Sequence, residues 1–445
     1  VTSPQRRLAV RGARVASPDV LAPLATGDLT FRLQGPLPAA LELAEMQAQR
    51  NGRSISLPGD NLDGRVDGQM KLILPFGDML GPDDIKLEAK GRVTDAKARN
   101  VLGGLDVNGA TIALDLTDQL LDAKGDLLLG GVAAKLAVQR IFAASDEDQP
   151  PLRLRANLDA ADRNQLGLDL NDLLQGDLPV EVTVATRRAA DPLVQLRADL
   201  TNTELLIEGL AWRKSPGRSA TLQFDIVRVA KTRTELQNFK IVGDDIALAG
   251  ALVLDGSNKV REFSFPDLSL NVVSRLEAHG TLRNDNVWVV KVRGATFDGR
   301  DFFQSLFSVG QLRDKPLPPR KDQSGVEITA ELDNVLGQQD LALKGLKLQI
   351  SRRAGRLVGL IARGTVDGSG REAGRVLEVG LQQTSNEPRR LVARSEDAGQ
   401  VFRLIGFYPN MQGGRMRLEV NLDGSGPAEK TGLLVVEGFA ILGDP

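Results

Sequence analysis

Segments in which apolar and polar residues strictly alternate recur along most of this 445-residue chain, and this pattern limits the folds that the chain can adopt. In RMRLEVNL (415–422), every second residue is apolar and the residues between are charged or carry an amide. Successive side chains of a β-strand point to opposite faces, so such a strand has one apolar and one polar face. The same pattern recurs in GDLTFRLQG (27–35), DIKLEAKGRV (84–93), GATIALDL (109–116), LRLRANLDA (152–160), LPVEVTVATRR (178–188), TLQFDIVRV (221–229), SGVEITAELD (324–333) and LKLQISRR (346–353).

Asn-Gly and Asp-Gly dipeptides are spread among these segments. Both residues of such a pair tolerate positive φ angles, which tight hairpin turns require. The dipeptides therefore predict hairpins, and successive hairpins make an antiparallel meander. They are Asn51-Gly52, Asp63-Gly64, Asp67-Gly68, Asn108-Gly109, Asp255-Gly256, Asp298-Gly299, Asp367-Gly368 and Asp423-Gly424.

The length of the chain predicts far more strands than one small sandwich or barrel uses. At about 12 to 15 residues per strand, the sequence has room for roughly thirty strands. An open sheet of more than about ten strands must curl or twist strongly. We therefore expect a mostly β fold: an elongated, strongly twisted antiparallel β-groove of repeating meanders, with a few short amphipathic helices.

Four segments predict those helices: 37–48, 162–174, 299–310 and 398–408. In the last, Asp397 and Gln400 have the spacing of a capping box, and Pro409 is expected to end the helix. We expect this helix to cover the apolar face of the sheet, and the alternative is a gate for ligand entry. The residues assigned to this cap or gate are Val401, Phe402, Leu404, Ile405, Phe407 and Tyr408.

Composition argues against several classes of function. The formal net charge is −2 and basic residues are scattered, which gives no footprint for nucleic acid. Cysteine is absent and His279 is the single histidine, so thiolate and histidine-rich metal sites are excluded. Acidic pairs such as Asp169 with Asp172 are explained by a helix end or a turn, and no G-x-S-x-G elbow occurs. We predict no catalytic residues, no metal, no cofactor and no enzymatic activity.

The sequence has no run of about 18 apolar residues, the length that a membrane-spanning helix needs. The polar residues after Val1 do not form a signal peptide. We expect the chain to be a piece of a longer protein, with membrane-engaging segments missing.

Two regions resemble a known family. The segments 389–426 and 433–445 resemble the AsmA-like C-terminal region, in which a strand ending in S-x-D-A-G leads to a helix and then to G-G-x-[ML]-x-[LF]. The segments 35–44 and 162–170 resemble the body of the YhdP branch of that family, to which TamB is a more distant relative. The resemblance implies a body over 1–312 and an AsmA-like groove region over 326–445. Between them, the Pro and charged residues of 313–325 predict a flexible loop.

The resemblance also implies a function and a location. Proteins of this family in Gram-negative bacteria are anchored in the inner membrane, project into the periplasm and are thought to carry phospholipid to the outer membrane. The expected partners are phospholipid acyl chains, both membranes through the missing segments, and periplasmic or membrane proteins. A scaffold or TamB-like assembly factor for outer-membrane biogenesis that conducts no lipid is the alternative.

A continuous aliphatic surface would suit lipid transfer because it shelters acyl chains from water at similar strength at every step, at about 25 cal/mol per Å² of apolar surface. For each residue on that surface, the alternative is a place in an ordinary core between two sheets. The residues that we predict to face the groove are Phe31, Leu33, Leu87, Leu114, Leu154, Val182, Phe224, Ile328, Leu348, Leu418 and Val420.

Overall fold

The protein consists mainly of β-strands, and only four short α-helices lie in the part of the chain that the structure describes. The chain divides into two compact units, Val1–Asn171 with Gly176–Asp199 and Asp172–Gln175 with Leu200–Pro445. Each unit is treated by itself below. The computed structural model describes residues 8–17, 26–50, 59–75, 86–168, 170–187, 190–207, 210–230, 232–305, 325–354, 356–367, 374–383, 388–423 and 431–443.

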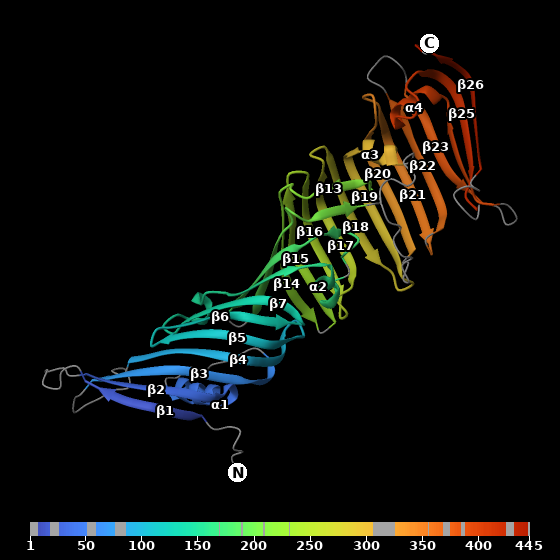
Figure 1. Ribbon diagram of the computed structural model, residues 1–445. Coiled ribbons are helices and arrows are strands. Elements are labelled where there is room, and N and C mark those ends of the chain that lie inside the picture. The colour runs from blue at the N-terminus through green and yellow to red at the C-terminus, as the bar shows by residue number, and fades with distance from the viewer. Residues whose placement is uncertain are drawn as a thin grey trace. The chain divides into compact units, whose positions relative to one another are not determined.

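In the first unit, the strands follow one another in chain order and each pairs antiparallel with the next (Figure 1). This is the predicted meander. Its strands are β1 (Ala9–Ala16), β2 (Thr26–Pro36), β3 (Asp60–Pro75), β4 (Lys86–Leu102), β5 (Leu105–Thr117), β6 (Leu120–Leu129), β7 (Val132–Ile141), β8 (Leu152–Leu158), β10 (Leu178–Arg187) and β11 (Ala190–Asp199).

In the second unit, the order is again that of the chain, but one pairing departs from the prediction. Strands β19 and β20 are parallel, whereas the other neighbours from β14 to β26 are antiparallel. The strands are β14 (Ala220–Ala230), β15 (Arg233–Gly243), β16 (Ile246–Asp255), β17 (Val260–Leu270), β18 (Ser274–Leu282), β19 (Val287–Asp298), β20 (Gly325–Leu336), β21 (Ala342–Arg353), β22 (Arg356–Asp367), β23 (Arg375–Gln382), β24 (Arg390–Ser395), β25 (Met411–Asn421) and β26 (Gly432–Ile441).

A small second sheet belongs to the second unit. Its central strand β12 (Glu204–Ile207) pairs antiparallel with β9 (Leu174–Gln175) and β13 (Trp212–Lys214). The segment 162–174, predicted as one helix, is helical only in its first part. Its helix α2 (Ala160–Gln165) begins earlier and stops after Gln165, and β9 follows within the range predicted as helical.

The other helices agree with their predicted starts to within one residue; residues 306–310 of the third predicted helix lie outside the described residues, and α4 ends sooner than predicted. Helix α1 spans Leu37–Arg50, α3 spans Arg300–Ser305 and α4 spans Ala398–Ile405. Helix α4 does not run to Pro409, because Gly406 adopts φ 72° and ends the helix as its left-handed cap. At the start of α4, Asp397 accepts a hydrogen bond of 2.9 Å from the backbone N–H of Gln400, as predicted for an N-cap.

Several Asp-Gly and Asn-Gly pairs lie inside strands and not in turns. Gly64 in β3 and Gly109 in β5 have φ angles of 135° and 59°, at positions where the register with the neighbouring strand shifts. Glycine at positive φ is a feature of β-bulges as well as of hairpins. Asp255-Gly256 does form the predicted turn, between β16 and β17, whereas Asn51-Gly52 and most of the predicted loop 313–325 lie outside the described residues.

Candidate functional site

Each unit carries one apolar sheet face that runs across its strands. In the first unit, a row of directly paired residues crosses eight strands without a polar side chain. From β3 to β11 the row consists of Val66, Val93, Ile112, Gly125, Leu136, Leu154, Val182 and Leu196.

The six groove residues predicted in the first unit lie on this face. Leu154 and Val182 belong to the row itself, and Leu33 and Leu114 belong to the adjacent row through Gly68 and Gly91. Phe31 pairs with Met70 and Leu87 with Leu72. All are half-buried except Leu154, which is 8% exposed in a packed cluster with Val93 and Leu127.

In the second unit, a row of ten apolar residues crosses ten consecutive strands. The predicted residues Leu348 and Leu418 belong to it, Ile328 lies two residues before its β20 member, and Val420 follows on the same face. Phe224 lies on this face in β14, and these five predicted residues are half-buried. From β17 to β26 the row is Phe265, Ala278, Val292, Ala330, Leu348, Ala362, Val379, Ala393, Leu418 and Leu434.

The opposite face of the same strands is charged. The row next to the apolar one crosses eight strands with a charged residue at every position, and it includes ion pairs of 3.5 Å between Arg293 and Glu331 and 3.4 Å between Arg363 and Glu378. The apolar face is thus one side of a two-faced sheet. From β18 to β25 the charged row is Glu277, Arg293, Glu331, Lys347, Arg363, Glu378, Arg394 and Arg417.

Helices cover the apolar face of the second unit along one of its two rims. We call this the capped rim; it contains the strand ends at Ala220, Ile246, Leu270, Val366 and Met411, which are at most 8% exposed. Helix α4 packs there, and of the residues assigned to the cap or gate, Val401, Phe402 and Leu404 are buried in one cluster with Phe303 of α3. Ile405 and Tyr408 pack against the same cluster, whereas Phe407 is 53% exposed, with its ring centroid 5.4 Å from that of Phe402.

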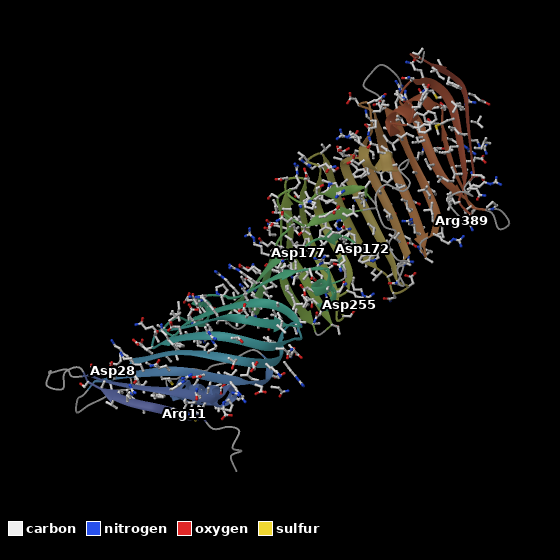
Figure 2. The ribbon with its side chains drawn as sticks, viewed as in Figure 1. Arg11, Asp28, Asp172, Asp177, Asp255 and Arg389 are labelled. Carbon is white, nitrogen blue, oxygen red and sulfur yellow. The ribbon has the colours of Figure 1, made fainter. Side chains whose placement is uncertain are left out.

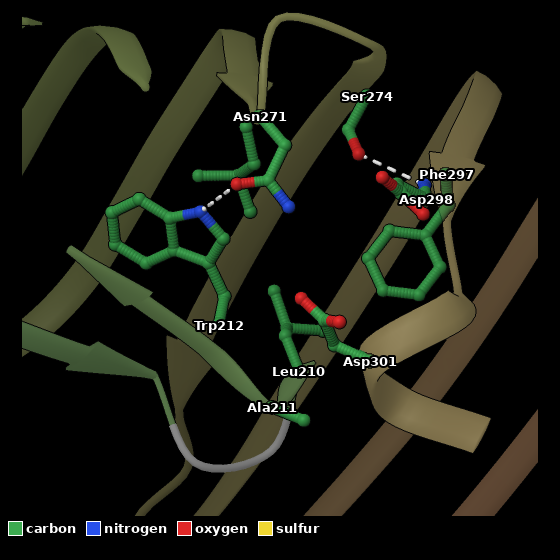
Figure 3. A pocket seen from close by; sticks show the side chains of 9 residues that line it. Leu210, Ala211, Trp212, Asn271, Ser274, Phe297, Asp298 and Asp301 are labelled. Carbon is green, nitrogen blue, oxygen red and sulfur yellow. Dashed lines mark hydrogen bonds between the residues drawn. The ribbon is translucent and has the colours of Figure 1, made fainter. Parts of the chain in front are cut away.

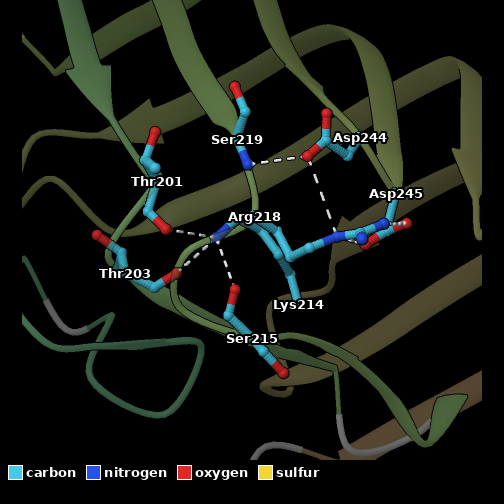
Figure 4. Close-up of polar contacts among 8 residues, drawn as sticks. All are labelled: Thr201, Thr203, Lys214, Ser215, Arg218, Ser219, Asp244 and Asp245. Carbon is cyan, nitrogen blue, oxygen red and sulfur yellow. Dashed lines mark hydrogen bonds and ion pairs between the residues drawn. The ribbon is translucent and has the colours of Figure 1, made fainter.

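The segment that holds the small sheet is held together by a buried cation and fixed to the capped rim by a surface cation (Figure 4). Lys214 is 1% exposed, and its Nζ donates to the backbone oxygens of Thr203 at 2.9 Å, Ser215 at 3.2 Å and Thr201 at 3.3 Å. Arg218 forms a bidentate pair with Asp245, with distances of 2.8 Å from Nε and 2.5 Å from Nη2. The Lys214 contacts hold the segment 200–219 together, and the Arg218 pair attaches it to the turn between β15 and β16.

A small pocket lies where this segment meets strands β17 to β19 (Figure 3). With a volume of about 10 Å³ it has room for about one water molecule. Two hydrogen bonds join its walls: Trp212 Nε1 donates to Asn271 Oδ1 at 2.8 Å, and the N–H of Asp298 donates to Ser274 Oγ at 3.0 Å. Arg300 lowers the pKa of the Asp298 carboxyl by hydrogen bonding to it. The pocket is therefore a packing feature of the capped rim.

The strand ends on the other side of the second unit form what we call the open rim, which includes the end of β16 at Asp255 and the start of β24 at Arg390. Turns at this rim carry charged residues. Asp255 lies at the turn between β16 and β17 (labelled in Figure 2). It accepts from the hydroxyl and N–H of Ser257, at 2.6 and 2.9 Å, and from Arg261 Nε at 2.8 Å. These donors, the Ser257 hydroxyl first, hold the pKa of Asp255 well below its usual range. Arg389 similarly binds Asp423, with Nε 2.7 Å from Oδ1.

Aromatic rings form a ladder on the apolar face of strands β14 to β19. Successive ring centroids are separated by 5.6 Å (Phe224 to Phe239), 5.8 Å (Phe239 to Phe265), 5.5 Å (Phe265 to Phe263) and 5.6 Å (Phe263 to Trp288). We call these five half-buried residues the aromatic ladder. It holds four of the 14 phenylalanines and one of the two tryptophans of a chain with only 4% aromatic residues.

Two glycines make room for the ladder, and they are the sequence signal that could have revealed it. Gly250 of β16 lies between Phe239 and the β17 rings, and a Cβ there would come within 2.8 Å of Phe265. Gly280 of β18 is paired with Phe263, and a Cβ there would come within 2.2 Å of the Phe263 ring. Glycine inside a strand often marks a close approach of this kind. Sequence reasoning selected Phe224 alone among the ladder residues.

Comparison with known proteins identifies no relative: no family model, no curated protein and no solved structure matches the chain. Among the described residues, no helix has the length and apolar character needed to cross a bilayer. In the same part of the chain, the His, Asp and Glu side chains form no group of three or more that could hold a metal ion.

Proposed function

We propose that this chain shelters the acyl chains of phospholipids on its apolar face and carries them between the inner and outer membranes of a Gram-negative bacterium. The observation that carries the proposal is the row of ten apolar residues from Phe265 to Leu434, of which most are half-buried and the last is 42% exposed. The resemblance of 389–426 to the AsmA-like region points the same way.

The physical reasoning concerns water. An acyl chain that crosses an aqueous compartment costs about 25 cal/mol for each Å² of apolar surface left in water. A face that is apolar at every strand removes that cost along its whole length, and the ten residues of the row carry no polar group that would bind an acyl chain more tightly at one strand than at the next. The charged opposite face remains solvated, and a headgroup would stay at the open rim.

A scaffold without lipid is the second candidate, and one observation favours it. The cluster of α3, α4 and the strand ends at the capped rim is closed, with Leu404 and Val366 at 0% exposure. A scaffold requires only such a core. The half-buried residues farther from this rim, including Ile328 and Leu348, are the part of the face that a scaffold leaves unexplained.

Native mass spectrometry and lipid extraction of the purified chain distinguish the two functions. Lipid transport predicts phospholipid that copurifies in a defined ratio, whereas a lipid-free and stable chain would support the scaffold.

A matched pair of variants then tests the face itself. Leu348→Arg places a charge on the apolar face, and Gln349→Arg places the same charge on the neighbouring, exposed position of the opposite face. We expect lipid binding to fall at least tenfold in Leu348→Arg and to be unchanged in Gln349→Arg, with circular dichroism as the check on folding. Equal binding by both variants would contradict the proposal.

A further inference from the structure

The aromatic ladder differs from the rest of the apolar face of the second unit in its shape and in the charges that flank it. Its rings span β14 to β19, five strand spacings, which is about 24 Å at about 4.8 Å per strand. One leaflet of a bilayer is roughly 15 Å thick, so a single acyl chain can lie along the ladder within its length. Ring faces over glycine give a flatter surface than branched aliphatic side chains.

Two arginines lie on the apolar side of the strands at the open rim, one beyond each end of the ladder. Arg228 follows Phe224 and Ile226 on the same face of β14. Arg352 of β21 is in register with Val326 of β20, which is itself in register with Trp288. Both arginines are exposed.

These two arginines lack the ion pairs that other arginines of the open rim make. Arg233 pairs with Glu235 at 3.0 Å, and Arg261 pairs with Asp255 at 2.8 Å. Arg228 and Arg352 have no ion-pair partner among the described residues. The alternation of β14 to β22 also directs their strand Asp and Glu residues to the opposite face, so no carboxylate on the apolar side competes for these guanidinium groups.

We propose that this region is a binding station for an anionic phospholipid, with one acyl chain along the aromatic ladder and the headgroup phosphate at Arg352. This inference rests on the proposed function and adds the class of headgroup. Arg352 lies two strand spacings, about 10 Å, from Trp288. A phospholipid whose acyl chain lies along the ladder can reach Arg352 with its headgroup phosphate over this distance. A guanidinium binds phosphate through paired N–H donors, and the described strands β14 to β22 direct no carboxylate to the apolar side for the ammonium group of a zwitterionic lipid.

Trp288 reports on this station directly, because bromine atoms on an acyl chain quench a tryptophan only at short range. The full chain is incubated with vesicles of phosphatidylcholine or phosphatidylglycerol that carry dibrominated acyl chains, and the vesicles are then removed by flotation. The fluorescence of Trp288 is obtained as the difference between the wild-type chain and Trp288→Phe. Trp212 remains in both and is 3% exposed at the capped rim.

We expect quenching of Trp288 by both lipids, with phosphatidylglycerol effective at a concentration at least five times lower. Arg352→Gln should abolish that preference and leave quenching by phosphatidylcholine in place. Arg394→Gln, which removes the same charge from the opposite face, should keep the preference.

The outcomes separate the two proposals. Equal quenching by the two lipids, or a preference that survives in Arg352→Gln, overturns the anionic station and leaves acyl-chain binding intact. If neither lipid quenches Trp288 but lipid copurifies, the station is wrong and the tails lie elsewhere on the face. If no lipid copurifies and none quenches, the proposed function fails as well.

Discussion

The rings of Phe263 and Trp288 lie 5.6 Å apart across strand β18, in which Gly280 is the residue paired with Phe263. The two aromatic residues come from strands that are not neighbours, and their contact exists because the intervening strand has no side chain at that position. The same arrangement recurs at Gly250, between Phe239 and Phe265. The rings of the ladder can therefore occupy these positions only because positions 250 and 280 have no side chain.

Alanine at the two ladder glycines should have different effects. In Gly250→Ala, the new Cβ would come within 2.0 Å of the backbone oxygen of Ser264, so the strands must shift, and we expect a loss of about 1–3 kcal/mol in the free energy of unfolding. In Gly280→Ala, the nearest atoms belong to the Phe263 ring, which can rotate away. We expect a smaller loss there, with a shifted Trp288 emission.

Urea denaturation measures both effects, and Gly380→Ala is the control. A Cβ at Gly380 would have its nearest neighbour at 3.6 Å, so this substitution should be neutral or stabilise the chain by up to about 1 kcal/mol. Equal losses at positions 250 and 380 would contradict the close approach described for β16.

Truncation of α4 should separate its packing role from a gating role. Leu404 is 0% exposed, and Leu404→Ala should lower the free energy of unfolding by about 2–5 kcal/mol because it leaves a cavity at the capped rim. Phe407 is 53% exposed, so Phe407→Ala should cost less than about 1 kcal/mol. Thermal and urea denaturation give the stabilities. Altered lipid loading in Phe407→Ala, at unchanged stability, would assign a gating role to that ring.

Leu154 is a stability residue as well as a member of the apolar row. It is 8% exposed, and Leu154→Ala should cost about 2–4 kcal/mol, while Leu154→Arg should destabilise the first unit further by burying a charge. Leu114, half-buried in the adjacent row, should tolerate alanine better. Limited proteolysis and urea denaturation would show the difference, and a fully stable Leu154→Arg chain would mean that the site is more open than the packed cluster indicates.

Acid should weaken the first unit through Asp67. Hydrogen bonds from Arg32 and then Gln34 lower the pKa of Asp67 to about 2. The carboxyl has a higher pKa in the unfolded chain, about 3.9. Its stabilising effect is therefore complete above about pH 4 and is lost as the pH falls through about 2.

The variant Asp67→Asn tests this window. The difference in stability between wild type and variant should be constant above about pH 4 and should disappear towards pH 2, as measured by urea denaturation at a series of pH values. Asp126→Asn, at an exposed position without a bound arginine in the described structure, is the control and should show a smaller difference. A difference that grows on acidification would have the wrong sign.

Alternation in the sequence predicted which residues share a face, because a period of two is a property of each strand by itself. The segments 346–353 and 415–422 agree with β21 and β25 to within a few residues, and Leu348 and Leu418 lie on the apolar face as expected. The mainly β architecture and the short helices follow from the same local pattern.

Features that depend on two or more strands were not predictable in this way. Asp63-Gly64 has the composition of a hairpin turn, but its place inside β3 depends on how β4 bulges against it. The last residue of a helix is set by its capping residue. Gly406, in a left-handed conformation, ends α4 before Pro409 is reached. The aromatic ladder, and an Arg352 with no ion pair among the described residues, required the pairing of strands that lie far apart in the sequence.

The parallel pairing of β19 with β20 places α4 on the same rim as α3. Helix α3 follows β19 at the capped rim, and β20 then starts again from the open rim beside Val287. Each later hairpin alternates between the rims, so β24 ends where β19 ended and α4 begins next to α3. With an ordinary hairpin after β19, the parity of the meander would be reversed, α4 would project from the opposite margin, and Phe303 and Phe402 could not share a hydrophobic cluster.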